Sequence, residues 1–178
     1  MGQQNFFDLT NIPPIANLTA VTATTETALW DAATYTAIAA GEGYAGKQWR
    51  LTAGGIMSFA STGTLTITPR FGTSIAGTTM GPSVVALTTP GATTAHSWWL
   101  DMLITVRTRG APGTNSTVIC NGMFCTGIPS AGSLPATQTF GGTSASVDLS
   151  IASGICIGWT LSVAGTVTPQ QICFGSPN

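Results

Sequence analysis

The sequence predicts an all-β protein, organised as one antiparallel sandwich or barrel. First, apolar and polar residues alternate in many short runs, which is typical of half-buried strands. Second, 22 Gly and 10 Pro residues separate these runs at short intervals, and both residue types favour turns. Third, no long helical segments lie between the runs, as expected for antiparallel sandwiches and barrels. The length of 178 residues fits one domain.

The alternating runs direct one set of side chains toward a core, because successive residues of a strand point to opposite faces. About eight to ten such strands are expected. In the long run from Leu100 to Val106 the outward face carries Asp101 and Thr105, and it continues to Arg107 and Arg109. The predicted core residues are Trp49, Leu65, Ile67, Met102, Ile104, Val106, Val147, Leu149, Ile157, Trp159 and Leu161.

Clusters of Gly and Pro are expected to end the strands as turns or bulges. These clusters are Gly54-Gly55, Pro69, Gly81-Pro82, Pro90-Gly91, Gly110 to Gly113, Ser130 to Pro135 and Gly141-Gly142. After the last of these clusters, Val147, Leu149 and Ile151 alternate with polar residues and predict a further strand. The stretch from Thr25 to Ala33 allows one short helix, capped by Thr and Glu side chains.

The N-terminal residues differ from the rest of the chain because they carry apolar side chains without alternation. A Pro-Pro pair in this segment favours an extended backbone. We therefore expect an extended arm over residues 1–24, followed by a single β-sandwich domain over residues 25–178. The arm lies either on a neighbouring subunit or back over its own sandwich. Its apolar and proline residues are Phe6, Phe7, Ile12, Pro13, Pro14 and Ile15.

Charge is scarce, and this excludes several functions. Charged residues make up 6% of the chain, against about 25% in an ordinary globular protein. The net charge of −1 provides no basic surface for nucleic-acid phosphates. No apolar run approaches the ~20 residues of a membrane-spanning helix. The N-terminus lacks the pattern of a secretion signal, so synthesis in a cytosol is expected.

The sequence predicts no catalytic or metal site, and no cofactor. His96 is the single histidine, and with Ser97 and Asp101 it could suggest a hydrolase triad. Adjacent residues of a strand point to opposite faces, so Ser97 is poorly placed to reach His96. The six acidic residues are scattered along the chain, and no His or Cys spacing fits a metal site. We therefore expect a protein that is not an enzyme.

The cysteines and tryptophans are expected to have mainly structural roles. Cys120, Cys125, Cys156 and Cys173 lack the C-x₂-C spacing of zinc or redox sites. Buried free thiols are the first interpretation, and a Cys156–Cys173 disulfide is the alternative. Trp98 shares the core face of its strand, so Trp99 is expected to point outward. An exposed indole can stack on the apolar face of a sugar.

Several segments resemble the jelly-roll modules in virion proteins of tailed bacteriophages, over about residues 22–175. The matching segments are Glu26-Thr27-Ala28-Leu29, Ile38-Ala39-Ala40-Gly41, Gly46-Lys47-Gln48-Trp49-Arg50-Leu51 with Gly54-Gly55, the run from Trp98 to Gly110, Asn121-Gly122-Met123-Phe124, and Ile157-Gly158-Trp159-Thr160-Leu161-Ser162-Val163. Ala39 stands where Pro is frequent in such modules. The resemblance implies an antiparallel β-sandwich of jelly-roll type in a virion surface protein.

From this resemblance we expect a capsid decoration (cement) protein, made in the cytoplasm of a host bacterium and bound to the outside of the head shell. Its partners would be the major capsid protein and itself, as a homotrimer, with no nucleic acid and no membrane. The expected interface residues are Phe6, Phe7, Ile12, Pro13, Pro14, Ile15 and Trp99. The alternative is a receptor- or glycan-binding module of a tail or head fibre, with contacts from Trp99, Gly110–Thr114 and Ser130–Thr137.

Overall fold

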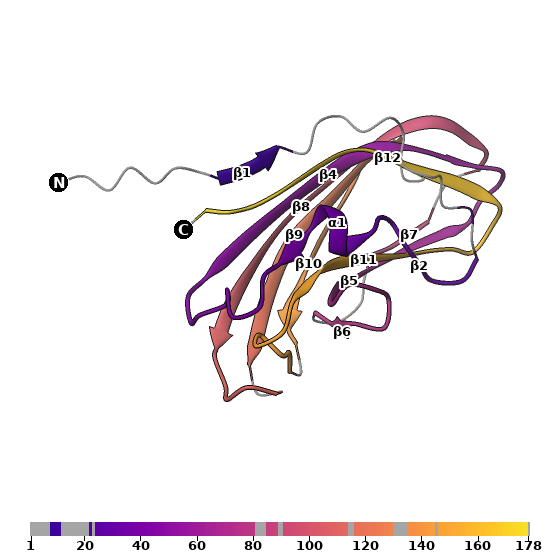
Figure 1. The fold of residues 1–178 in the computed structure, drawn as a ribbon. Helices are drawn as coiled ribbons and strands as arrows, with labels where there is room; N and C mark the ends of the chain where they lie inside the picture. Colours follow the sequence, from indigo (N-terminus) through magenta and orange to yellow (C-terminus); the bar gives the residue numbers. More distant parts are fainter. Residues whose placement is uncertain are drawn as a thin grey trace.

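A computed structural model describes residues 8–11, 22, 24–80, 85–88, 91–113, 116–129, 135–144 and 146–177. Two antiparallel sheets pack against each other as a sandwich (Figure 1). The predicted all-β antiparallel sandwich is therefore confirmed. Within the described ranges the one α-helix is α1 (Ala32–Tyr35), which lies beside the strands of the smaller sheet.

Each sheet combines strands from distant parts of the sequence. The larger sheet has the order β1 (Asp8–Asn11), β12 (Gly165–Ser176), β4 (Gln48–Phe59), β8 (Thr93–Thr108), β9 (Thr117–Pro129) and β10 (Pro135–Thr143). The smaller sheet has the order β2 (Thr27–Ala28), β11 (Ser153–Leu161), β5 (Thr64–Phe71) and β6 (Thr78–Thr79), with β3 (Ala37–Ile38) paired to β11 and β7 (Val85–Thr88) paired to β5.

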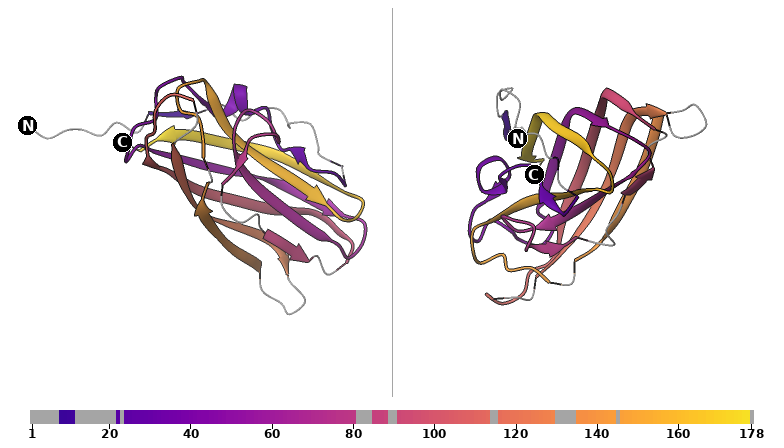
Figure 2. Two further views of the ribbon diagram at one scale, coloured as in Figure 1. Left: turned by 90° about the horizontal axis from the view of Figure 1, so that it is seen from below. Right: turned by 90° about the vertical axis from the view of Figure 1, so that its right-hand side faces the viewer.

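The chain crosses between the sheets in a nested way. The β4–β5 segment passes from the larger to the smaller sheet, and the β11–β12 segment passes back. These two segments pair along both sheets, β4 with β12 and β5 with β11. The β7–β8 segment pairs with the opposite edges of β4 and β5: β8 with β4 in the larger sheet, and β7 with β5 in the smaller sheet. Figure 2 shows how β12 and β4 run side by side although they are far apart in the sequence.

An aromatic cluster joins the two sheets at the centre of the core. The ring centroids of Trp98 and Trp159 are 5.7 Å apart, and those of Phe124 and Trp159 are 5.8 Å apart in an edge-to-face arrangement. Such pairs add to the free energy gained from burial alone. Trp98 and Phe124 come from the larger sheet and Trp159 from the smaller one. All eleven predicted core residues are buried.

Strand β11 is buried on both faces, which the alternating pattern did not predict. Every residue from Gly154 to Trp159 is buried. The N-terminal segment covers the outer face: the Trp30 Nε1–H and the Thr36 hydroxyl both donate to the Ile155 carbonyl, at 3.3 and 2.6 Å. The predicted short helix lies later than expected, because Thr27 and Ala28 pair with β11 as strand β2. Asp31 then caps α1 by accepting from the Ala33 N–H.

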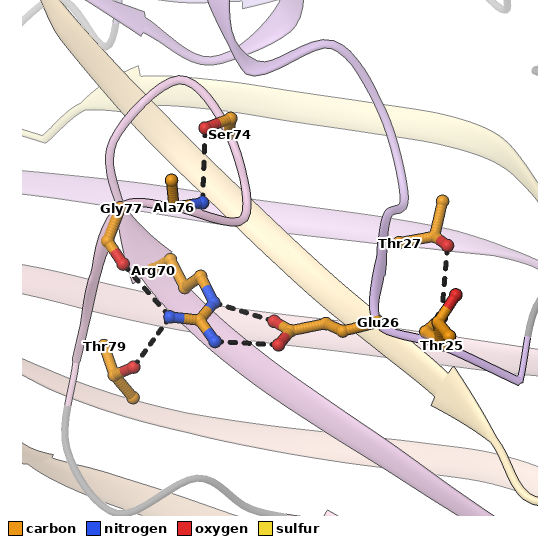
Figure 3. A network of polar contacts seen from close by, with 8 residues as sticks. All are labelled: Thr25, Glu26, Thr27, Arg70, Ser74, Ala76, Gly77 and Thr79. Carbon is orange, nitrogen blue, oxygen red and sulfur yellow. Dashed lines mark hydrogen bonds and ion pairs between the residues drawn. The ribbon is translucent and has the colours of Figure 1, made fainter.

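A bidentate ion pair fixes this N-terminal segment to β5 (Figure 3). The Arg70 guanidinium donates through Nε and Nη2 to the two carboxylate oxygens of Glu26, each at 2.7 Å. Its Nη1 donates to the Gly77 carbonyl and to the Thr79 hydroxyl. The hydrogen bonds to Glu26 raise the pKa of Arg70. Gly158 of β11 lies beneath Glu26, in a space that a Cβ atom would have to share with the carboxylate.

Three of the predicted turns or bulges lie inside strands, so they are wrong as turns, although Gly54-Gly55 does face a register shift in β12. Gly54-Gly55 lies in β4, Pro69 in β5 and Gly141-Gly142 in β10. The glycines permit close backbone approach rather than chain reversal: a Cβ on Gly55 would collide with the Thr168 carbonyl oxygen. Gly55 and Gly54 pair with Pro169 and Gln171 of β12, and the register of the two strands shifts between these two residues.

The other predicted turns have different outcomes. Gly110 to Gly113 follows the end of β8 as expected, and Gly113 has a positive φ of 109°. Pro135 belongs to strand β10. The positions 81–82, 90 and 130–134 lie outside the described residues.

The predicted strand at Val147–Ile151 is also wrong. Val147 and Leu149 are buried, but Ile151 is 58% exposed, and the segment joins no sheet: it has an isolated bridge from Val147 to Ser116 and a hydrogen bond from the Gly41 N–H to the Leu149 carbonyl. The Asp148 carboxylate accepts from the backbone N–H and the hydroxyl of Ser150, at 2.8 and 2.6 Å. These bonds lower the pKa of Asp148 and close a local turn, which ends the extended run.

Four residues of the predicted N-terminal arm form strand β1, antiparallel to β12 of the same chain, with Asn11 opposite Cys173. The arm residues on which the interface prediction rests, Phe6, Phe7, Ile12, Pro13, Pro14 and Ile15, lie outside the described residues. The choice between an arm on a neighbouring subunit and an arm on its own sandwich therefore stays open for them.

The prediction of four free thiols is confirmed, since none of the cysteines forms a disulfide, but the burial that was also predicted holds for two of them only. Cys120 and Cys156 are buried, whereas Cys125 and Cys173 are half-buried on the larger sheet. Burial raises the pKa of Cys120 to about 12 and that of Cys156 to about 11.

The aromatic cluster generates the first prediction. Trp159→Ala should lower the free energy of unfolding by about 3–5 kcal/mol, as large truncations in a core do. Trp159→Phe should cost less, because it keeps a ring against Trp98 and Phe124 and removes an indole N–H that is buried without a partner. Equilibrium unfolding in urea measures both. Equal losses for the two variants would contradict this account of the cluster.

The thiols generate the second prediction. Without reductant at mildly alkaline pH, Cys125 and Cys173 should react quickly with a thiol reagent in the native protein. Cys120 and Cys156 should react only after unfolding, because their raised pKa values leave little thiolate and burial blocks access. Cys125→Ser and Cys173→Ser should each remove one fast-reacting group. Fewer than the four thiols of the sequence in denaturant would show that a disulfide exists.

Candidate binding face

The outer face of the larger sheet carries the exposed side chains that offer the most for binding. On β4, β8 and β9 every second residue points outward, because the residues between them, such as Leu51, Leu100 and Phe124, are buried in the core. The central outward positions are Arg50, Thr52, Gly54, Trp99, Asp101, Leu103, Asn121, Met123 and Cys125. We call this set the outer face.

A bidentate ion pair lies at the centre of the outer face. Arg50 on β4 donates through Nε to Asp101 Oδ1 at 3.0 Å and through Nη2 to Oδ2 at 2.7 Å. Thr52 is the residue directly opposite Asp101, so the pair is a diagonal cross-strand contact. The hydrogen bonds to Asp101 raise the pKa of Arg50. Because the Arg50 side chain is 56% exposed, the pair contributes about 0–1 kcal/mol to stability.

Trp99 lies one outward position before Asp101 on the same strand. Its register partner is Gly54, and a Cβ atom on Gly54 would lie 3.1 Å from Cε3 and 3.6 Å from Cζ3 of the indole. The missing side chain at Gly54 therefore lets the indole lie against β4. Trp99 is 40% exposed whereas Trp98 is buried, which confirms the predicted orientation of both residues.

Two hollows flank the ion pair. One, of about 360 Å³, is lined by Arg50, Asp101, Leu103, Asn121, Gly122 and Met123. The other, of about 580 Å³, is lined by Gln48, Arg50, Thr52, Leu103, Cys173, Gly175, Ser176 and Pro177. Arg50 and Leu103 border both. The face thus combines recessed apolar surface with side-chain amides, hydroxyls and one planar guanidinium.

The remaining candidates from the sequence are not brought together. His96 lies near the start of β8, and its neighbour Ser97 is exposed while His96 is half-buried. Among the acids, Glu26 pairs with Arg70, Glu42 with Lys47, and Asp101 with Arg50. In the described part of the chain, no three His, Cys, Asp or Glu side chains lie close enough to hold a metal ion. No helix in the same part is long and apolar enough to cross a membrane.

The basic residues do not form one charged docking surface. Lys47 is buried and lies 3.8 Å from Glu42. Arg50 and Arg70 have carboxylate partners on different sheets. Arg107 and Arg109 are exposed at the end of β8. Most of the positive charge is therefore neutralised by pairs within the protein.

The structure separates the residues that the glycan-binding alternative joined. Trp99 lies nine residues before the end of β8 at Thr108, about 30 Å along the strand, and Gly110–Gly113 follows beyond that end. Thr137 does lie near Trp99, because Cys125 pairs with both residues. Residues 114 and 130–134 lie outside the described part of the chain.

The sequence reasoning missed the Arg50–Asp101 pair and the two hollows beside it. Alternation already indicated that Asp101 points outward. Alternation does not give the register of β4 against β8, and it is this register that brings Arg50 within reach of Asp101.

Comparison with protein-family models, with curated proteins and with solved structures finds no match to this chain.

Proposed function

We propose that this chain is a decoration protein of a tailed bacteriophage, bound to the outside of the head shell. It stabilises the shell by binding only the assembled state, so that disassembly requires its release. The proposal follows from the resemblance to phage jelly-roll modules. The two packed antiparallel sheets support it, because a jelly-roll module is a double-sheet antiparallel structure.

The observation that carries the proposal is the uncharged surface. No charged residue occurs from Gly110 to Val147, a range that includes β9 and the edge strand β10. Thr137, Gln138 and Thr139 of β10 are exposed, and in the described residues β10 pairs on one side only, with β9. A free protein normally uses surface charge to avoid association. A surface without it suits a protein that spends its functional life inside an assembly.

The contacts with the shell would therefore be apolar and hydrogen-bonded. Strand β10 offers backbone groups to a neighbouring strand, and it lacks the lysines that protect an edge from such pairing. The N-terminal segment offers Phe6, Phe7 and the residues around Pro13. A homotrimer would place three copies of these contacts around a local threefold axis of the shell.

The third prediction tests the location and the contact chemistry together. On a gel of purified particles, the chain should be present in amounts comparable with the major capsid protein. Its occupancy should change little between low salt and about 1 M salt, where the Debye length falls to about 3 Å. A copy number far below that of the capsid protein would place it in a tail or fibre. Release by salt alone would indicate docking through exposed charges such as Arg107 and Arg109.

The fourth prediction concerns the N-terminal arm. Deleting residues 2–20 removes β1, which is an edge strand, and leaves β4 to β12 intact. The truncated chain should still show β-type circular dichroism and a cooperative melt, but it should fail to trimerise or to bind empty capsids. Sedimentation of capsids with bound protein measures the binding. Full occupancy by the truncated chain would mean that the arm only covers its own sandwich.

A further inference from the structure

We propose that the outer face around Trp99 binds a neutral oligosaccharide, with the indole as the stacking surface and the Arg50–Asp101 pair as the partner of the sugar hydroxyls. This goes beyond the proposed function, since it would hold for a decoration protein or for any other location. It shares Trp99 with the glycan-binding alternative considered for the sequence, but it places the other contacts on the sheet and not on Gly110–Thr114 and Ser130–Thr137.

The first step of the argument is the support for the indole. Trp99 lies against the bare backbone of Gly54, where a Cβ atom would come within 3.1 Å of the indole Cε3. The ring is thereby held on the sheet while 40% of the residue stays open to solvent. A sugar ring has an apolar face of C–H groups, and an aromatic ring held in this way can pack against that face.

The second step is the spacing to the ion pair. Trp99 and Asp101 are two residues apart on β8, so their side chains lie on the same face about 7 Å apart. This distance is close to the width of one sugar unit. Both oxygens of Asp101 accept from Arg50, and each keeps a further lone pair for a hydroxyl donor. Hydrogen bonds to ionised groups are stronger than those between neutral groups.

The third step is the charge of the ligand. Among the outward residues at the centre of β4, β8 and β9, Arg50 and Asp101 are the only charged ones, and they neutralise each other. Such a face has no net charge with which to select an anionic or cationic ligand. The hollows on either side, of about 360 and 580 Å³, provide room for further sugar units beyond the one on Trp99.

A protein partner fits this face less well. Protein interfaces have a broad apolar centre and bury about 800 Å² on each side. Among the described residues of the outer face, only Trp99 and Met123 are large exposed apolar side chains. The remaining surface is recessed and carries small or polar groups such as Thr52 and Asn121.

The experiment uses the full chain labelled with ¹⁵N and follows the indole N–H signals by NMR. The probes are cellohexaose, maltohexaose and hexa-N-acetylchitohexaose, all uncharged, at millimolar concentration. At least one should shift the Trp99 signal saturably, with the signal assigned through Trp99→Phe. The indole N–H groups of Trp30, Trp49 and Trp98 donate to acceptors inside the protein, so their signals should stay in place.

Variants separate the two parts of the site. Trp99→Ala should weaken binding about tenfold, which corresponds to the free energy of one aromatic contact. The double variant Arg50→Ala with Asp101→Ala should weaken it by a similar factor without leaving an unpaired charge. Ile151→Ala, which also removes an exposed apolar side chain, should leave the affinity unchanged.

Two results would overturn the proposal. In the first, none of the three probes shifts the Trp99 signal, or Trp99→Ala binds the probe as tightly as the original chain. In the second, Trp99→Ala changes the sedimentation behaviour of the protein and no sugar binds, which would make this face an interface between copies of the chain. Retention of the indole signals of Trp30, Trp49, Trp98 and Trp159 shows that each variant is folded.

Discussion

The structure depends on the packing of Trp159 against Trp98 and Phe124, which joins the two sheets. Because Trp159 belongs to β11, this contact fixes β11 as the centre of the smaller sheet and leaves its other face to be covered. The N-terminal segment provides that cover, and the ion pair of Glu26 with Arg70 secures it. The short helix, strands β2 and β3 and the buried glycines of β11 are all consequences of one strand that is enclosed on both sides.

Much of this fold could be predicted from the period-two pattern, because alternation depends only on neighbouring residues. It assigned the core correctly, and it distinguished buried Trp98 from exposed Trp99. It failed where distant segments decide the local structure. From the sequence alone Gly55 resembles a turn residue. The structure shows that it is a strand residue whose missing side chain makes room for the Thr168 carbonyl of β12. The candidate binding face was predictable only in part: the outward position of Asp101 follows from alternation, but its pairing with Arg50 needs the register between two strands.

The few charges of this protein serve its own architecture. Glu26, Glu42 and Asp101 each neutralise a basic side chain of the same protein, so that little charge remains for steering partners over long distances. Recognition must then come from shape, hydrogen bonding and apolar contact at close range. The two proposals use neighbouring regions of the larger sheet, with the shell at the β10 edge and the N-terminal arm, and the saccharide on the face between Trp99 and Arg50.

The nested pairing of β4–β5 with β11–β12 also governs how the protein is made. A ribosome completes β4 and β5 early, but their partners on one side emerge only with the last strands. Until then the nascent chain exposes the edges of both strands and the core surfaces that Trp159 will cover. Contacts between distant segments slow folding, and exposed edges favour aggregation during the delay. Expression at low temperature, or with chaperones that hold nascent chains, should therefore raise the soluble yield more than any change to the finished surface.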